Sequence, residues 1–328
     1  MLKEQMLASD ERRVTISFYR YCRIENPEFF RDHLFIHLSE LGVLGRIYVA
    51  SEGINAQISV PLSHFAAFEE FLDGIGFLKD IRLNLAVEET GKSFYVLKIK
   101  NRRKIVADGI DDPNFNALNT GTYLSAEDFN KMTDDPDTVI IDMRNHYESE
   151  VGRFDQAWCP DVDTFREQLP VVAAELEDKK DRKVVMYCTG GIRCEKASAY
   201  MRYKGFENVY HLEGGIIKYA RDVKAKGLEN KFKGKNFVFD ERLEETIGDE
   251  IIAQCHQCGK PFDHHSNCKN VACNLLFIQC PECADKMKGT CSDGCLEIIR
   301  LPLDVQKELR KGQDSGIRIF SKGRFKSI

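Results

Sequence analysis

Hydrophobic and polar residues recur along the first hundred positions with two different periods. Alternating apolar and polar side chains predict strands, and apolar side chains three or four residues apart predict helices. The expected strands are 14–21, 46–50, 56–60 and 94–99, and the expected helices begin at Pro27 and Leu62. This order is typical of a ferredoxin-like or acylphosphatase-like α+β domain, which we place at 14–110 after a flexible leader at 1–13.

From about residue 118 to 225, short, largely apolar runs alternate with helical patterns. Three such runs lie at 139–142, 184–187 and 208–211. Strands that are apolar on both sides and separated by helices are typical of a parallel sheet with helices on both faces. The sequence therefore predicts a central α/β domain at 118–225. A small cysteine-rich region follows at 226–328, with a last strand expected at 237–242 and a basic tail.

The loop after the run at 184–187 carries the strongest candidate chemistry. Cys188 opens the loop, Arg193 closes it, and the residues between them are Thr189, Gly190, Gly191 and Ile192. A strand that leads through a short loop into a helix points several backbone N–H groups at one place, where the helix N-terminus adds partial positive charge. A thiol there ionises readily, and the thiolate is the reactive form. We therefore predict that Cys188 is catalytic; a buried cysteine before an ordinary helix is the alternative.

A second motif lies upstream, at the end of the run at 139–142. It consists of Asp142, Arg144, Glu148 and Gly152, and we expect the first three to support the loop, with Arg144 and Glu148 forming an ion pair. Together, Cys-x4-Arg and Asp-x-Arg-x3-Glu-x3-Gly resemble the two signatures of the rhodanese sulfurtransferases. In that family the loop backbone surrounds a cysteine persulfide.

The residues that follow Cys188 resemble a narrower family. They read Cys-Thr-Gly-Gly-Ile-Arg-Cys-Glu-Lys-Ala-Ser, and Leu-Glu-Gly-Gly-Ile follows at 212–216. This wording resembles the rhodanese-domain tRNA uridine hydroxylases, which were formerly catalogued as uncharacterised sulfurtransferase-like proteins. The resemblance extends from about Val14 to about Cys295.

The resemblance implies oxygen-dependent hydroxylation of the wobble uridine of tRNA to 5-hydroxyuridine. Molecular oxygen would be the co-substrate, and Cys188 would act as a nucleophile or as a persulfide. The residues alone leave two alternatives open: a sulfurtransferase that takes sulfur from a donor through a Cys188 persulfide, and a non-catalytic tRNA-binding module. No flavin or nicotinamide fingerprint and no His/His/carboxylate iron triad stands out in the sequence.

Eight cysteines lie within the cysteine-rich region at short spacings. They are Cys255, Cys258, Cys268, Cys273, Cys280, Cys283, Cys291 and Cys295. Four thiolates around one ion are typical of structural zinc, so eight suit two tetrahedral sites. Reduced thiols packed in a small core are the alternative.

Composition limits the compartment and the mode of RNA binding. Twelve cysteines, no membrane-length apolar run and no signal-peptide core favour a cytoplasmic protein with catalytic or metal-binding thiols rather than disulfides. The net charge is −5, so contact with tRNA must depend on a local basic patch. We expect this patch after the fourth strand, although a charge run is also typical of a solvated face; its residues are Lys98, Lys100, Arg102 and Arg103.

Overall fold

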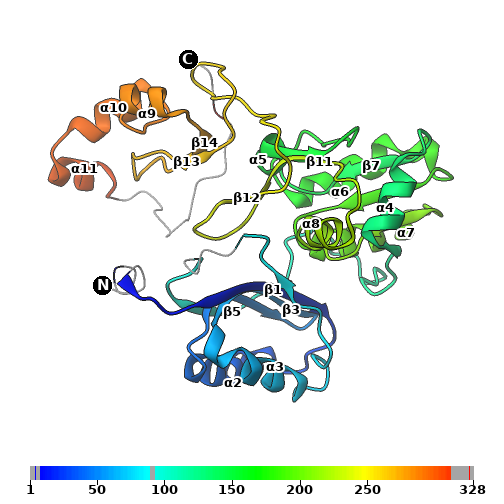
Figure 1. Ribbon diagram of the computed structural model, residues 1–328. Helices are drawn as coiled ribbons and strands as arrows, with labels where there is room; N and C mark the ends of the chain where they lie inside the picture. Colours follow the sequence, from blue (N-terminus) through cyan, green and yellow to red (C-terminus); the bar gives the residue numbers. More distant parts are fainter. Residues whose placement is uncertain (1–3, 5–7, 89–92, 312–324, 326–328) are drawn as a thin grey trace.

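The computed structural model describes residues 4, 8–88, 93–311 and 325 of the 328-residue chain. Figure 1 shows an N-terminal sheet with helices beneath it, a central α/β domain to its upper right, and a smaller C-terminal part at the left. About half of the predicted leader, and nearly all of the basic tail beyond residue 311, lie outside the described residues.

The N-terminal domain has the predicted α+β architecture. Its elements are β1 (Arg13–Tyr21), α2 (Pro27–Glu40), β2 (Leu44–Ala50), β3 (Gly53–Pro61), the 3-10 helix η1 (Leu62–His64), α3 (Phe65–Asp73), β4 (Asn84–Leu85) and β5 (Leu97–Asn101). The sheet order is β4-β1-β3-β2-β5. The strand expected at 94–99 is β5, which starts at Leu97 and runs parallel to β2 at the sheet edge, whereas the two-residue strand β4 was not predicted.

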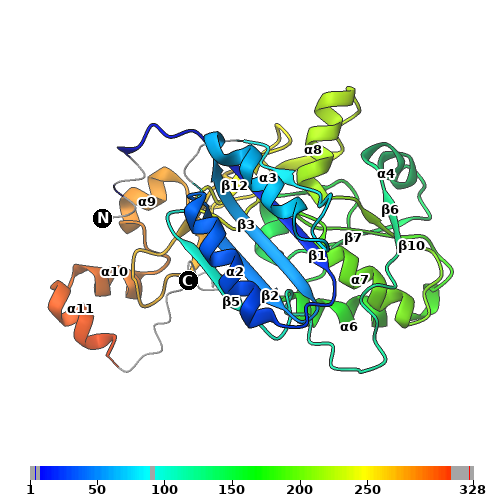
Figure 2. The same ribbon diagram turned by 90° about the horizontal axis from the view of Figure 1, so that it is seen from below.

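The two faces of this sheet have opposite character because strand side chains alternate. One face carries apolar residues such as Ile16, Phe18 and Ile58, which pack in the core between the sheet and the helices α2 and α3. Figure 2 shows these two helices lying across the sheet. The other face, called the polar face below, carries Ser17, Tyr19, Arg46, Tyr48, Asn55 and Gln57.

The central domain is a parallel sheet of order β6-β10-β9-β7 with helices on both faces, as predicted. Its elements are β6 (Thr122–Leu124), α4 (Ala126–Thr133), β7 (Val139–Asp142), α5 (His146–Val151), β8 (Gly152–Phe154), α6 (Phe165–Glu175), η2 (Glu177–Lys179), β9 (Val184–Tyr187), α7 (Ile192–Tyr203), β10 (Val209–Leu212) and α8 (Gly215–Lys226). Along β9, Val184 and Met186 enter one hydrophobic core, and Val185 and Tyr187 enter the other. This arrangement explains why that strand is apolar throughout.

The C-terminal part continues directly from the central domain. Its elements are β11 (Phe232–Phe237), β12 (Glu244–Thr246), β13 (His265–Asn267), β14 (Leu276–Ile278), α9 (Pro281–Met287), α10 (Asp293–Arg300) and α11 (Leu303–Leu309). The strand expected at 237–242 is wrong in position, because β11 ends at Phe237 after pairing with β8 and β12. Among the described residues, no helix combines the length and apolar character needed to cross a bilayer.

The polar face of the N-terminal sheet docks on the loop that follows β9. The hydroxyl of Tyr19 donates to Glu195 at 2.8 Å, and the hydroxyl of Tyr21 donates to the carbonyl of Ile192 at 3.2 Å. Asn84 donates to the carbonyl of Gly190 at 3.2 Å. The two domains therefore form one site between them.

Candidate active site

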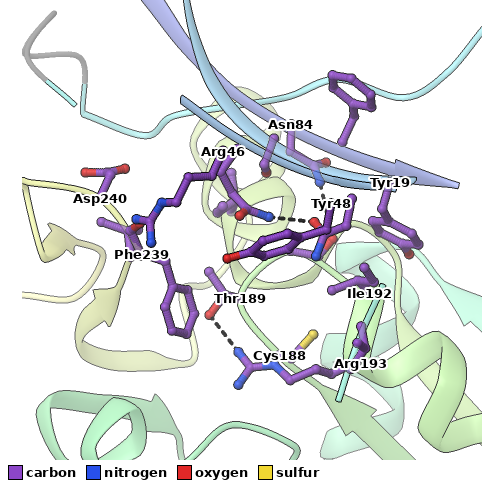
Figure 3. Close-up of a pocket in the computed structure, with 18 of the residues that line it drawn as sticks. Tyr19, Arg46, Tyr48, Asn84, Cys188, Thr189, Ile192, Arg193, Phe239 and Asp240 are labelled. Atoms are coloured by element: carbon purple, nitrogen blue, oxygen red, sulfur yellow. Dashed lines mark hydrogen bonds between the residues drawn. The ribbon is translucent and has the colours of Figure 1, made fainter. Parts of the chain in front are cut away.

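A cavity of about 630 Å³ lies between three parts of the chain. The polar face forms one wall, the loop 188–193 forms the floor, and the segment 238–245 forms a further wall. In Figure 3, Tyr48 and Arg46 extend from the sheet, and Phe239 extends from the C-terminal segment, into the space above Cys188. We call the loop 188–193 the active-site loop.

The backbone of the active-site loop is held so that its N–H groups face the Cys188 sulfur. The N–H of Gly191 donates to Sγ at 3.2 Å, and α7 begins at the next residue. The carbonyls of the first two loop residues accept hydrogen bonds from the start of α8. The N–H of Ile216 binds the carbonyl of Cys188 at 3.0 Å, and the N–H of Ile217 binds that of Thr189 at 3.2 Å.

Two glycines are required by this geometry. Gly191 has φ +98°, and a Cβ there would lie 2.9 Å from the hydroxyl oxygen of Tyr19. Gly215 has φ +64°, and a Cβ there would lie 2.4 Å from the carbonyl oxygen of Cys188. Both backbone conformations are strained for other residues, and both clashes would push a neighbour out of the site. Gly215, the second glycine of the Gly-Gly pair downstream of the loop, thus has a structural role in holding Cys188.

The pKa of the Cys188 thiol is lowered to about 6. Burial alone would raise this pKa, but the hydrogen bond from the Cys194 thiol, the charge of Arg193, and the N–H groups of Cys194 and Gly191 outweigh burial. The pKa of Cys194 is raised well above its ordinary value by burial and by the bond to Cys188, so Cys194 keeps its proton and donates it. At neutral pH the Cys188 sulfur is therefore a thiolate.

The prediction of an ion pair between Arg144 and Glu148 is wrong. Glu148 instead forms a bidentate pair with Arg193, with N–O distances of 2.6 and 2.7 Å. Arg144 turns back to Asp142 at 2.6 Å and donates to the carbonyl of Gly152 at 2.5 Å. Burial raises the pKa of Glu148, but the charge and hydrogen bonds of Arg193 outweigh burial and hold this pKa below its ordinary value. All three predicted support residues are buried beside the loop, in two pairs rather than one.

Curated relatives resemble nearly the whole chain. A protein of Pectobacterium carotovorum is 58% identical over 98% of this chain and 91% of its own length, and one of Photorhabdus laumondii is 56% identical over 98% and 92%. Both are named tRNA uridine(34) hydroxylase. The chain belongs to this family. The resemblance inferred from the active-site motifs is thereby confirmed.

Three family models match successive parts of the chain. They are the UPF0176 acylphosphatase-like domain at residues 13–105, the rhodanese-like domain at 125–222 and the rhodanase C-terminal model at 233–296. The solution structure of a rhodanese-like domain from Anabaena sp. is 21% identical, covers 34% of this chain and 78% of its own, and has a TM-score of 0.27.

The eight C-terminal cysteines gather into two clusters that alternate along the chain. One consists of Cys255, Cys258, Cys280 and Cys283, and the other of Cys268, Cys273, Cys291 and Cys295. Within each cluster all sulfur atoms lie within 4.8 Å of one another. The Sγ atoms of Cys258 and Cys280 are 3.7 Å apart, and those of Cys273 and Cys291 are 3.6 Å apart. Zn–S bonds of about 2.3 Å in a tetrahedron place sulfurs about 3.8 Å apart, so both clusters fit zinc.

The predicted tRNA-binding residues divide into two groups. Lys98 and Lys100 are exposed on β5 and stand in register with Arg46 and Tyr48 of β2, so they extend the polar face beyond the cavity. Arg102 lies over the ring of Tyr48, 5.3 Å from its centroid. Arg103 is separate, because it is exposed and paired with Asp111 at 2.8 Å.

Several cavity residues were missed in the sequence. Tyr48, Gln57 and Asn84 come from the N-terminal sheet, and Phe239 and Arg242 come from the C-terminal segment. The polar residues at alternate positions of β2 and β3 showed only that one sheet face lies outside the core, since antiparallel sheets commonly expose one face to solvent. The segment 238–245 gave no signal, because nothing local indicates that it reaches Cys188.

We predict that Cys194→Ala shifts the ionisation of Cys188 to higher pH, by about one unit, because the thiolate loses a charge-assisted hydrogen bond. The measurement is the rate of Cys188 alkylation against pH, read by mass spectrometry of the peptide containing it. The wild-type rate should rise through about pH 6. Cys194→Ser keeps a donor and should shift the midpoint less. An unchanged midpoint in Cys194→Ala would show that Arg193 and the backbone suffice.

Proposed function

We propose that this protein hydroxylates the wobble uridine of tRNA at C5, giving 5-hydroxyuridine, with molecular oxygen as co-substrate. The observation that carries the proposal is the stabilised thiolate of Cys188 at the floor of a cavity of about 630 Å³. This volume is typical of sites for small molecules, and a nucleobase must leave its stack to be modified. The relatives named above carry this activity in their name.

The chemistry follows from the position of the thiolate. When the Cys188 sulfur adds to C6 of uracil, an enolate forms across C5 and C4, and C5 becomes a nucleophile. Attack of C5 on molecular oxygen gives a peroxide anion, which takes a proton from solvent and becomes a hydroperoxide. Two equivalents of a small thiol reduce the hydroperoxide to the alcohol and water, and the two thiols form a disulfide. Loss of the C5 proton and of the Cys188 thiolate restores the double bond and releases 5-hydroxyuridine.

In this scheme the loop residues stabilise negative charge on sulfur. The N–H of Gly191 and the thiol of Cys194 hold the thiolate before addition and after release. None of the twelve cysteines, all of which lie in the described part of the chain, forms a disulfide, which suits the reducing cytoplasm in which we place the protein. A Cys188 persulfide, loaded by a sulfur donor, is the alternative form of the same residue.

We predict that Cys188→Ser abolishes 5-hydroxyuridine, because an alcohol is not ionised near neutral pH. A strain that lacks the gene is complemented with each variant, and the nucleosides of its tRNA are measured by mass spectrometry. The variant should give the level of the deletion strain, whereas Cys159→Ser, which alters a half-buried thiol of the same domain, should give the wild-type level. A covalent adduct with 5-fluorouridine tRNA supports addition; a requirement for cyanolysable sulfur supports the persulfide. An active Cys188→Ser protein contradicts both.

We also propose that tRNA phosphates bind the edge of the polar face, at Lys98, Lys100 and Arg102. These cations continue the cavity wall outward, and a chain with a net charge of −5 depends on such a local patch. Arg103 has an acidic partner and contributes less.

Neutralising Lys98 and Lys100 to Gln should weaken tRNA binding and flatten its salt dependence by about 1.5 in the logarithmic slope, because two phosphate contacts are lost. Titrations at several salt concentrations measure the slope. Lys180→Gln with Lys183→Gln is the matched control, since these residues precede β9 and lie at the opposite end of that strand from Cys188. If the salt dependence of tRNA binding changed equally in both double variants, the proposal that the phosphates bind at β5 would be contradicted.

Finally, we propose that each cysteine cluster holds one structural zinc ion. The protein purified without chelator should contain about two zinc ions per chain by elemental analysis. Cys258→Ser and Cys273→Ser should each lose one ion, because they belong to different clusters, and Cys22→Ser in the N-terminal domain should lose none. Zinc well below one per chain, with a folded C-terminal part, contradicts the proposal.

A further inference from the structure

Two amide side chains of the polar face line the cavity side by side. Asn55 and Gln57 both belong to β3, and they lie between β1, which contacts the active-site loop, and β2, which carries Tyr48. Gln57 pairs in register with Ser17, whose hydroxyl oxygen lies 3.7 Å from the place of a Cβ on Gly190. The two amides are therefore close to the loop, on the wall opposite to it.

The orientation of both amides is fixed by a backbone carbonyl. The Nδ2 of Asn55 donates to the carbonyl oxygen of Ile105 at 3.3 Å, and the Nε2 of Gln57 donates to the Oδ1 of Asn55 at 2.6 Å. Because a carbonyl oxygen can only accept, Asn55 must turn its NH2 group towards Ile105 and its oxygen towards Gln57. Gln57 must in turn present its NH2 group to Asn55.

This chain of bonds leaves Gln57 with one acceptor and one donor for a ligand. Among the described residues no hydrogen bond reaches its Oε1, and its second N–H is not engaged. Uracil has an N3–H donor beside carbonyl acceptors, which match an amide in this orientation. Cytosine has an unprotonated N3 beside an amino group, which would need the amide turned round. A fixed amide therefore distinguishes the two bases, whereas a free amide would accept either.

We propose that Gln57 reads the N3–H and an adjacent carbonyl of the target uracil, and that Asn55 holds Gln57 in the orientation that excludes cytosine. This inference rests on the proposed function, which supplies uridine as the substrate. The N3 side of a pyrimidine is opposite to its C5–C6 edge. A base held by Gln57 on the sheet wall thus turns C5 and C6 towards the active-site loop and Cys188.

Tyr48 completes the binding surface. It stands beside Asn55 in register, and Figure 3 shows its ring in the space above the loop. An aromatic ring stacks on any base and strengthens binding without regard to sequence. Lys98 and Lys100 follow on the next strand, where the sugar and phosphate of the extruded nucleotide would leave the cavity. In this proposal β3 selects the base, whereas β2 and β5 contribute affinity that does not depend on the base.

The test is competition between two anticodon stem-loop RNAs that differ only in U34 or C34, measured by binding to the full-length protein. The wild-type protein should prefer the U34 RNA by about ten- to hundredfold. Gln57→Met removes the donor and the acceptor but keeps a side chain of similar size. The ratio of U34 to C34 affinity should therefore fall towards one, because the U34 RNA binds more weakly. Asn55→Leu removes the bond that fixes the Gln57 amide, so Gln57 can turn. The preference of this variant for the U34 RNA should therefore fall, because the C34 RNA binds more tightly.

Lys100→Gln is the matched control, because loss of a phosphate contact should weaken both RNAs equally. Thermal unfolding of each variant verifies that it folds. Unchanged preference in Gln57→Met and Asn55→Leu, or equal weakening of both RNAs, overturns the inference. The proposed function is read separately, as 5-hydroxyuridine made by the wild-type protein. If none is made while the U34 preference depends on Gln57, the proposed function fails and base recognition stands.

Discussion

The position of the N-terminal sheet over Cys188 depends on one buried cation. Lys196, on the first turns of α7, is 1% exposed and contacts Glu52 and Asp108 at 2.6 Å each. Glu52 lies in the turn between β2 and β3, and Asp108 lies in the segment between β5 and β6. Removing one partner from such a buried group costs about 3–5 kcal/mol, because the remaining charges are left unpaired. Together with the hydrogen bonds of Tyr19, Tyr21 and Asn84, this pairing holds the sheet over the loop, where the two enclose the cavity.

A second buried ion pair, between Arg193 and Glu148, changes the role of the active-site arginine. A Cys-x4-Arg loop suggests that the arginine attracts an anion, but the charge of Arg193 is shared with Glu148 through two short bonds. The thiolate then depends more on neutral donors, namely the N–H of Gly191 and the thiol of Cys194. Because Glu148 already balances the charge of Arg193, this arginine offers little further attraction to an anionic sulfur donor.

Local patterns in the sequence predicted local structure well. The strands at 139–142 and 184–187 have the predicted bounds, because each is buried on both faces and its apolar run is unambiguous. The strand β4 was missed since two residues carry no period, and they are a strand only through pairing with β1. The Arg144–Glu148 pair failed for a related reason. Their spacing allows contact, but only the tertiary fold brings Arg193 to Glu148, and it is the nearer partner.

The long-range parts of the site follow the same rule. The active-site loop was predictable because it is continuous in sequence, whereas Gln57 and Phe239 reach it from opposite ends of the chain. The cysteine spacings indicated pairs, but they did not indicate which pairs share a cluster. Only the folded chain shows that the first and third pairs form one cluster and that the second and fourth pairs form the other.

The C-terminal clusters are linked to the catalytic loop through a single short helix. Residues two apart on a helix point to opposite sides, and α5 uses both sides. Glu148 faces the active-site loop and binds Arg193, while Glu150 faces the C-terminal part and contacts His256 at 2.6 Å. His256 lies next to Cys255, a member of the first cluster. The segment 238–245, which forms a wall of the cavity, runs from the end of β11 into β12 and belongs to the same C-terminal part. A metal that orders the first cluster would therefore steady both the arginine that braces the loop and the wall that covers it, at a distance from the chemistry.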